Sequence, residues 1–336
     1  MVKYPIKRIL KNKKHYYYSA TGLQIKDTNL INQIKKLGIP PAYKTVDIFE
    51  PSAKIQAISV DDKGRKQYKY HPLFVDERVR KKYRNLIHFV SAYSKIMSKL
   101  ESKYRNMKNG TPTTKEDIIC LILGLMNTCK IRSGCMKHFK QNGSYGTTTL
   151  LRKHFIIKNK EISLKFKGKS GVINTCTINK KNKLYSVLLN YLKLKKNKDE
   201  YIFTYDDVLI TQYDINNYLR YISKTHISAK AFRTYHANLD FINSALELHH
   251  SIHKPNTLTN SNIKSNFKEI TNNLATNLHH TSATFKQSYL YPPLKELYLT
   301  NYKTFIKKFK NKNPESSFIK FIKKNTSNKK NIPKKW

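Results

Sequence analysis

Apolar and polar positions alternate in short runs through the first part of the chain, a pattern typical of β-strands. Aromatic and β-branched residues gather at 16–18 and 53–60, and turn-forming residues separate these runs. Residues 61–64 (Asp-Asp-Lys-Gly) indicate a hairpin, and residues 65–70 alternate as its returning strand. We therefore predict a small β-rich domain over residues 1–80.

From about Val79 the hydrophobic period becomes helical, and it stays so up to the Asn-Gly pair at 109–110. A second helix is expected next, capped by Thr113 or Thr114 and built around the apolar run 118–126. That run is too short to cross a bilayer, and no other apolar run of the sequence approaches the required length. We expect no membrane partner.

Three strands are predicted after this helix, at 146–151, 162–166 and 171–173. The tight turn between the last two, 167–171, is expected to expose Lys169 at its tip.

The chain is predicted to be mainly helical beyond Leu184. One apolar helix face is formed by Tyr235, Leu239, Ile242 and Leu246. Arg233 therefore lies early on that helix. The very basic segment beyond Leu299 is expected to be a solvated or partly disordered arm that adds non-specific affinity for a polyanion.

Charge narrows the choice of partner. Lys and Arg number 65 against 21 Asp and Glu, which gives a formal net charge of +44. The excess runs along the whole chain, so a nucleic acid is favoured over the partners of a ribosomal-type or membrane-surface protein. The abundance of Lys, Asn, Ile and Tyr also indicates a gene rich in A and T. With 23 Tyr and 15 Phe the chain is expected to fold rather than to stay disordered.

The cysteines give no sign of a metal centre. They stand at 120, 129, 135 and 176 without a Cys-x-x-Cys pair, so a zinc site is not expected. We expect reduced thiols in an intracellular protein, since the N-terminus lacks the features of a secretory signal. Neither a metal nor a cofactor is predicted.

Five separated residues are the best candidates for chemistry: Arg132, Lys169, Arg233, His280 and Tyr289. If three fixed cations and an imidazole converge on one phenol, that phenol could attack a phosphodiester without a metal. Phosphoryl transfer depends mostly on positioning and charge stabilisation.

The local contexts of these residues match a family. The matching segments are 63–70 (Lys-Gly-Arg-Lys-Gln-Tyr-Lys-Tyr), 131–134 (Ile-Arg-Ser-Gly), 166–169 (Phe-Lys-Gly-Lys), 233–235 (Arg-Thr-Tyr) and the nine-residue interval from His280 to Tyr289. In this order the chain resembles the poxvirus-type DNA topoisomerases IB, small enzymes also found in giant viruses and some bacteria. The resemblance runs from about Leu37 to Tyr289.

The resemblance implies an α+β fold with two parts. These are a β-rich N-terminal DNA-binding domain, 1–80, and a mainly helical catalytic domain, 81–336, with a three-stranded sheet, a tyrosine recombinase-like catalytic fold and a basic C-terminal tail. It also implies a type IB topoisomerase that relaxes supercoiled duplex DNA without ATP or metal. Tyr289 would attack a phosphorus to give a 3′-phosphotyrosyl enzyme and a free 5′-hydroxyl, which later reverses the step.

Roles follow from side-chain chemistry. Arg132 and Arg233 offer planar forks to the non-bridging oxygens. His280 is expected to donate a hydrogen bond to one of these oxygens. Lys169 is the candidate acid for the leaving 5′-oxygen, and the surrounding cations must favour the deprotonated phenol of Tyr289.

Alternatives stay open at this point. Arg132 could be a cation that only stabilises a helix C-terminus. Other candidates are Lys165 or Lys167 for the acid, His279 for the imidazole and Tyr291 for the nucleophile.

The candidate DNA contacts outside these five are Arg65, Gln67, Tyr68, Tyr70, Lys137 and Lys230. A hairpin strand that bears Gln67, Tyr68 and Tyr70 can lie in a major groove and touch base edges. The alternative is that both tyrosines pack in the core of the small domain. Ser133, Cys135 and His138 depart from the residues typical of poxvirus enzymes, so a cleavage-sequence preference is not carried over.

The main alternative function is that of a tyrosine site-specific recombinase, and a non-enzymatic DNA-packaging protein is a third. The β-rich N-terminal domain favours the topoisomerase over the recombinase. We expect a monomer that closes as a clamp around double-stranded DNA, with residues 76–84 as the linker and hinge. The composition and the resemblance suggest a large DNA virus, and so the virion or the viral factory in the host cytoplasm.

Overall fold

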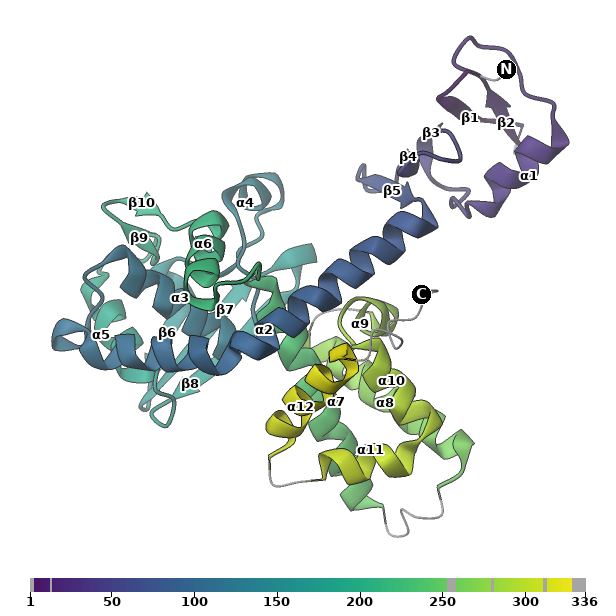
Figure 1. Cartoon of the computed structure of the whole chain (residues 1–336). Coiled ribbons are helices and arrows are strands. Elements are labelled where there is room, and N and C mark those ends of the chain that lie inside the picture. The colour runs from purple at the N-terminus through teal and green to yellow at the C-terminus, as the bar shows by residue number, and fades with distance from the viewer. Residues whose placement is uncertain (1–2, 13, 253–257, 279–280, 311–312, 328–336) are drawn as a thin grey trace. The chain divides into compact units, whose positions relative to one another are not determined.

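The computed structural model describes residues 3–12, 14–252, 258–278, 281–310 and 313–327. These fall into two compact units, which divide between Lys82 and Tyr83. Each unit is described by itself, and Figure 1 labels the elements of both.

The N-terminal unit is an antiparallel five-stranded sheet with one helix. The strand order is β2-β1-β3-β4-β5. The elements are β1 (Ile6–Lys11), β2 (Lys14–Tyr18), α1 (Thr28–Lys36), β3 (Lys44–Ile48), β4 (Ile55–Val60) and β5 (Lys66–Tyr70). The predicted β4–β5 hairpin is confirmed. Helix α1, capped by the Asp27 side chain, was not predicted.

The division between the units falls within the predicted linker, 76–84, which is part of the continuous helix α2 (Pro72–Asn106). The helix also begins earlier than predicted. No residue from Pro72 to Lys82 is buried, whereas Tyr83, Leu86 and Phe89 are. The helical hydrophobic period therefore begins only where the helix acquires a buried face, because the apolar residues of the first three turns (Leu73, Phe74, Val75 and Val79) are not buried.

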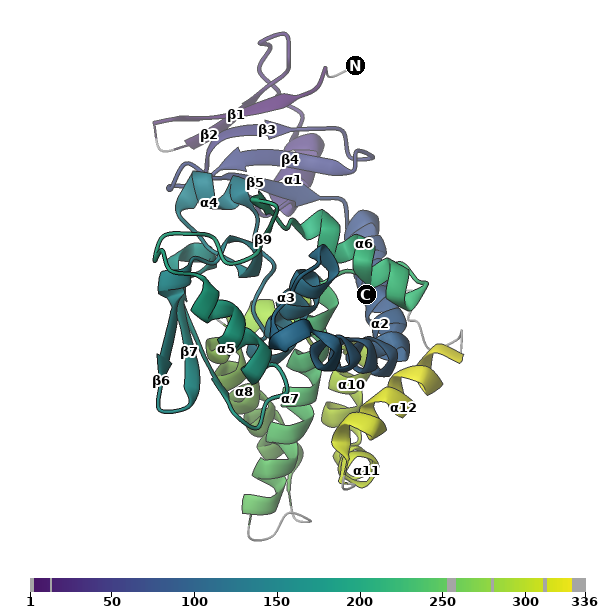
Figure 2. The same ribbon diagram turned by 90° about the vertical axis from the view of Figure 1, so that its left-hand side faces the viewer.

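The second unit places a buried helix beside a three-stranded antiparallel sheet. Helix α3 (Lys115–Cys129) is capped by Thr114, which forms a capping box with Asp117. Thr114 is one of the two residues that were predicted to cap this helix. The sheet order is β6-β7-β8, with β6 (Phe155–Lys158), β7 (Glu161–Lys167) and β8 (Ile173–Asn179). Helix α4 (Met136–Asn142) lies between α3 and the sheet in sequence, and α5 (Tyr185–Leu194) lies against β7 (Figure 2).

Residues 146–151 do not form the predicted strand. Thr147–Thr149 is a 3-10 turn. The main-chain N–H groups of Thr147 and Thr148 donate to the carbonyls of Arg132 and Ser133. These threonines are β-branched and buried, which is typical of a strand. Their main-chain hydrogen bonds join them to the loop at 132–133 instead of to a neighbouring strand.

The rest of the unit is mainly helical, as predicted. A short hairpin, β9 (Thr204–Tyr205) and β10 (Val208–Leu209), precedes the remaining helices. These are α6 (Gln212–Ser223), α7 (Lys230–Ser251), α8 (Asn260–Asn277), α9 (Ser282–Ser288), α10 (Pro292–Thr300), α11 (Tyr302–Phe309) and α12 (Pro314–Ser327).

The expectation of a solvated arm beyond Leu299 is wrong for the residues that the structure describes there. Helices α11 and α12 pack on α7 and on each other. Phe305, Phe309, Phe318 and Ile322 are buried. Their spacing of four residues gives each helix one apolar side, although each helix also carries three lysines. Residues 328–336 lie outside the described range.

The predicted fold class is confirmed: an α+β chain with a small N-terminal sheet and a larger, mainly helical unit that carries a three-stranded sheet. Among the described helices, none combines the length and the apolar character that a membrane span requires.

Candidate active site

Arg132 stands just after the C-terminus of α3. Lys130 adopts a left-handed conformation with φ 54°, which ends the helix and turns the chain away from its axis. The Arg132 carbonyl then accepts hydrogen bonds from both the N–H and the Oγ1 of Thr147, each at 2.9 Å. Thr147 therefore holds the main-chain carbonyl of Arg132 through two hydrogen bonds.

Gly134 makes this arrangement possible by close approach to a second glycine. It has φ 77°, and a Cβ built on it would lie 2.7 Å from the Cα of Gly146. Only glycine fits at this crossing, because any side chain would collide with main-chain atoms. The segment that carries Arg132 is thereby fixed against residues 146–148.

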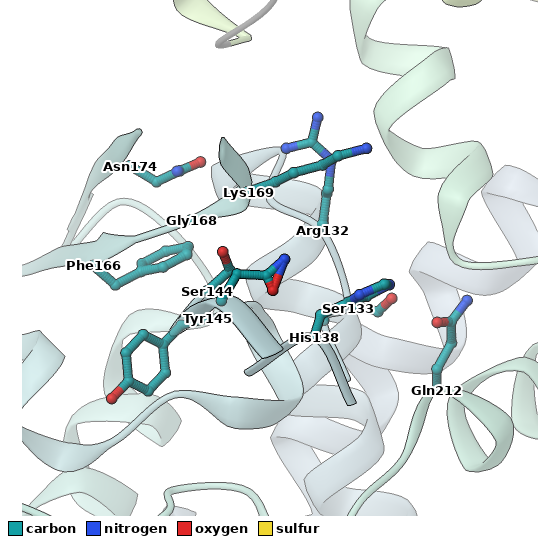
Figure 3. Close-up of a pocket in the computed structure, with 12 residues that line it drawn as sticks. Arg132, Ser133, His138, Ser144, Tyr145, Phe166, Gly168, Lys169, Asn174 and Gln212 are labelled. Atoms are coloured by element: carbon teal, nitrogen blue, oxygen red, sulfur yellow. The ribbon is translucent and has the colours of Figure 1, made fainter. Parts of the chain in front are cut away.

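Lys169 lies at the exposed tip of the β7–β8 hairpin, as predicted. Ser170 (φ 63°) and Gly171 (φ 78°) form the turn, which the hydrogen bond from Gly168 N–H to Val172 O closes at 2.8 Å. Figure 3 shows the Lys169 side chain extending toward Arg132, and both residues line a cavity of about 320 Å³.

Arg233 lies in the first turn of α7 and is only 4% exposed. Its Nη1 donates to the Lys130 carbonyl at 2.7 Å, and its Nη2 donates to the Leu278 carbonyl. Burial and the neighbouring charge of Arg132 lower the pKa of Arg233 to about 10, while the phenol of Tyr289 acts in the opposite direction. The guanidinium therefore stays charged at neutral pH.

Tyr289 follows the last turn of α9 and is 6% exposed. The centre of its ring lies 5.8 Å from the guanidinium carbon of Arg233. Tyr289 also lines a larger cavity, of about 810 Å³, together with Arg132, Lys169 and Lys230. The structure thus brings four of the five predicted residues together. His280, like the alternative His279, lies outside the described residues.

Asn238 is a residue of this site that the sequence did not reveal. It is fully buried on α7, and its Nδ2 donates to the carbonyls of Thr234 (2.7 Å) and Tyr289 (2.9 Å). Its Oδ1 accepts from the Tyr291 N–H at 2.6 Å. One side chain therefore holds the main chain on both sides of Leu290. An amide inside an otherwise apolar helix face was the available signal.

The alternative candidates have different surroundings. Tyr291 is 5% exposed, its ring centre lies 5.4 Å from that of Tyr83, and burial raises its pKa to about 12. Lys165 and Lys167 lie on strand β7. Among the described lysines, Lys169 and Lys230 are those that line the 810 Å³ cavity.

The β4–β5 hairpin of the N-terminal unit holds two of the predicted DNA contacts through one carboxylate. Asp61 accepts from Arg65 Nε at 2.8 Å and from Gln67 Nε2 at 2.9 Å. These bonds lower the pKa of Asp61 to about 2, and the bond from Arg65 has the largest effect. Arg65 keeps 62% of its side chain exposed.

The two tyrosines of this hairpin lie outside the core of the small unit, so the alternative that both pack there is wrong. Tyr68 is 46% exposed and stacks on Tyr70, with ring centres 6.2 Å apart. Arg78 lies over the Tyr70 ring at 5.1 Å. In the larger unit, Lys137 and Lys230 are both exposed, in the first turns of α4 and α7.

The cysteines correct the expectation of reduced thiols. Cys129 at the end of α3 and Cys176 on β8 form a disulfide, whereas Cys120 and Cys135 are free. The pair is 47 residues apart in sequence, so only the packing of β8 against α3 reveals it. Within the part of the chain that the structure describes, no three His, Cys, Asp or Glu side chains form a group that could hold a metal ion.

A buried phenol beside fixed cations, with an exposed lysine at the same cavity, is chemically suited to phosphoryl transfer. Residues 65–317 match the family model of the eukaryotic DNA topoisomerase I catalytic core, and residues 14–61 match that of the bacterial DNA topoisomerase IB N-terminal domain. These matches define an enzyme of the DNA topoisomerase I class.

Similar proteins narrow the class. A DNA topoisomerase 1B of Acanthamoeba polyphaga mimivirus is 33% identical over 92% of this chain and 91% of its own length. A DNA topoisomerase 1B of Vaccinia virus (strain Copenhagen) is 25% identical over 66% of this chain and 71% of its own. The chain belongs to the type IB DNA topoisomerase family. A crystal structure of the XerH site-specific recombinase bound to difH is 13% identical, with a TM-score of 0.34 over 62% of this chain and 52% of that one.

Proposed function

We propose that this enzyme relaxes supercoiled duplex DNA by cutting one strand with Tyr289 and then resealing it. The observation that carries the assignment of the nucleophile is the position of the Tyr289 phenol, 5.8 Å from the Arg233 guanidinium and in one cavity with Arg132 and Lys169. Membership of the type IB family supports the reaction.

Charge explains how a phenol can act here. A free phenol has a pKa of about 10 and is a poor nucleophile at neutral pH. Arg233 is buried and held by two main-chain carbonyls, so its positive charge stays beside the ring. Together with Arg132 it stabilises the negative charge that develops on the attacking and non-bridging oxygens in the transition state.

The cleavage step exchanges one ester for another. The phenolic oxygen of Tyr289 loses its proton to solvent and forms a bond to phosphorus, and the bond from phosphorus to the 5′-oxygen breaks. Lys169 gives the proton that this oxygen needs, since its exposed ammonium lies at the mouth of the same cavity. His280, although outside the described residues, is proposed to donate to a non-bridging oxygen.

Religation reverses these transfers. The 5′-hydroxyl attacks the phosphotyrosine, Lys169 takes its proton back, and the phenolic oxygen of Tyr289 leaves and regains a proton from solvent. The energy of the broken phosphodiester is kept in the tyrosyl ester, so the cycle is proposed to need neither ATP nor a metal.

DNA contact is assigned to both units. We infer that residues 1–80 form a DNA-binding domain and residues 81–336 the catalytic domain of a monomeric clamp. The exposure of Tyr68 and of Arg65 on the β4–β5 hairpin supports contact with bases and phosphates. Lys230, exposed at the larger cavity, and Lys137 are proposed to hold the strand near the scissile phosphate.

The relatives come from a giant virus and from poxviruses, which supports a viral protein that acts in the cytoplasm of its host. We propose that it works in the virion or the viral factory.

Trapping the covalent intermediate tests the nucleophile. The enzyme is incubated with a duplex labelled on the 5′ side of a nick-prone site, denatured with detergent and digested for mass spectrometry. A nucleotide attached through its 3′-phosphate to Tyr289 is the expected result. Attachment to Tyr291 or to another side chain would overturn the assignment.

A further inference from the structure

The disulfide joins the two segments that carry Arg132 and Lys169. Cys129 is the last residue of α3, three positions before Arg132. Cys176 lies in the middle of β8, opposite Leu164 of β7, on the hairpin whose tip holds Lys169. The two Cα atoms are 5.6 Å apart. The bond therefore fastens the Lys169 hairpin to the end of the Arg132 helix.

The α3 end of this link is anchored independently. Lys130 Nζ pairs with both oxygens of Asp240 on α7, at 2.7 and 2.8 Å. The Lys130 carbonyl also accepts from Arg233 Nη1. These contacts do not involve sulfur, so the helix end and the arginines keep their places when the disulfide is broken. We therefore expect a broken disulfide to act on the hairpin rather than on the helix end.

The hairpin tip has features of a segment that gains from an added restraint. Gly168 and Gly171 flank Lys169 and Ser170, and glycine loses the most conformational freedom when it is ordered. On the β7 side, the Lys167 carbonyl accepts from the Tyr145 N–H at 2.8 Å. On the β8 side, Ile173 is 47% exposed, and the strand packs against α3 where the disulfide joins the two.

We propose that the Cys129–Cys176 disulfide positions Lys169 as the proton donor and that its redox state sets the rate of strand cleavage. This rests on the proposed function, in which Lys169 protonates the leaving oxygen. A restrained hairpin keeps the ammonium within reach of that oxygen, whereas a loosened one delivers it less often.

The bond is open to small reductants. Both cysteines line a cavity of about 470 Å³, which Lys130, Asn174 and Arg233 also border. Dithiothreitol can supply the two electrons and two protons that convert the disulfide into two thiols, and it becomes a cyclic disulfide. The proposal therefore needs no further reactant.

Peptide mapping without reductant tests the bond itself. The air-oxidised full chain is expected to give a cross-linked peptide pair containing Cys129 and Cys176. A Cys135→Ser variant, which removes a free thiol near the site, should give the same pair. Four free thiols under oxidising conditions, or a link from Cys129 to Cys135, would overturn the proposal.

Single-turnover cleavage tests the role. One substrate carries an ordinary 5′-oxygen at the scissile bond and the other a 5′-sulfur, whose thiolate leaves without a proton donor. Reduced enzyme and the Cys129→Ser/Cys176→Ser variant are expected to cleave the oxygen substrate at least about tenfold more slowly than oxidised enzyme, a loss within the range of a ~1 Å misplacement. All forms should cleave the sulfur substrate within about twofold of each other.

A Lys169→Ala variant separates this proposal from the proposed function. It should be slow on oxygen and near normal on sulfur. If it is slow on both substrates, the acid role of Lys169 fails. If it behaves as expected but reduction changes neither rate, or slows both equally, the disulfide does not position the acid. Oxidised Cys135→Ser should match oxidised wild type and respond to reductant in the same way.

Discussion

The guanidinium of Arg233 donates to two main-chain carbonyls, those of Lys130 and Leu278, and lies beside the Tyr289 ring. A buried cation is costly unless such partners compensate for lost water. Here one carbonyl lies at the C-terminus of α3 and the other at the C-terminus of α8. These two helix ends therefore fix the position of the Arg233 charge on α7. At the residue scale, electrostatics and fold cannot be separated.

Asn238 offers a test at the same scale. In Asn238→Ala the carbonyl of Tyr289 and the N–H of Tyr291 lose their buried partner, which we expect to cost about 1–3 kcal/mol of unfolding free energy. Because these groups flank the nucleophile, the cleavage rate constant should also fall by about tenfold or more. Denaturant unfolding and single-turnover cleavage measure the two effects.

Asn273→Ala, at an exposed position of α8, is the matched control and should change neither quantity. If Asn238→Ala loses stability but keeps the wild-type cleavage rate, Asn238 supports the fold without positioning Tyr289.

At the scale of elements, the C-terminal helices matter most for the site. Tyr235, two residues after Arg233 on α7, donates to the Glu315 carboxylate of α12, and the ring of Phe318 lies 5.9 Å from that of Tyr235. Helix α12 therefore packs directly behind the turn that carries Arg233. The segment beyond the nucleophile is part of the catalytic unit.

Removing one ring from α12 tests this packing. Phe318 is fully buried, so Phe318→Ala should lower the unfolding free energy by about 3–5 kcal/mol through lost burial and a residual cavity. Lys320→Ala, at an exposed position of the same helix, should change it by less than about 0.5 kcal/mol. Similar values for the two variants in denaturant unfolding would mean that α12 is not docked on α7.

The elements also show what the sequence could reveal. Strands β4, β5 and β7, the α3 cap and the tip position of Lys169 follow from local patterns, and the structure agrees. Two predictions failed because a local pattern reports burial and side-chain branching rather than hydrogen-bond partners. The start of α2 was missed because it is not buried, and residues 147–149 were predicted as a strand because threonine is β-branched. The disulfide and Asn238 depend on contacts between segments 47 and 51 residues apart, which local pattern does not encode.

On the scale of the whole molecule, buried histidines couple stability to pH. Burial lowers the pKa of His154 to about 4 and that of His236 to about 3, with lesser contributions from Lys153 and Lys130. His154 Nδ1 accepts from the Leu151 N–H at 3.0 Å, which a protonated ring cannot do. Both rings are therefore neutral in the folded state over a range where the unfolded chain binds protons.

The sign of the pH effect follows from these directions. Unfolded histidine titrates near pH 6.5, so the unfolded state takes up more protons from about pH 6.5 down to about 4 at His154 and to about 3 at His236. We expect the unfolding free energy to be at its full value above about pH 6.5 and to fall through this window. Denaturant unfolding at a series of pH values should show a smaller fall in His154→Asn, and an equal fall in that variant would contradict the assignment.

The central claim is that Tyr289 makes this chain a topoisomerase, and relaxation of negatively supercoiled plasmid tests it most directly. Wild type, Tyr289→Phe and Tyr291→Phe are compared in EDTA without ATP. We predict relaxation by wild type and by the Tyr291→Phe control, and none by Tyr289→Phe. Relaxation that persists in Tyr289→Phe, or a wild type that binds the plasmid but leaves it supercoiled, would contradict the account.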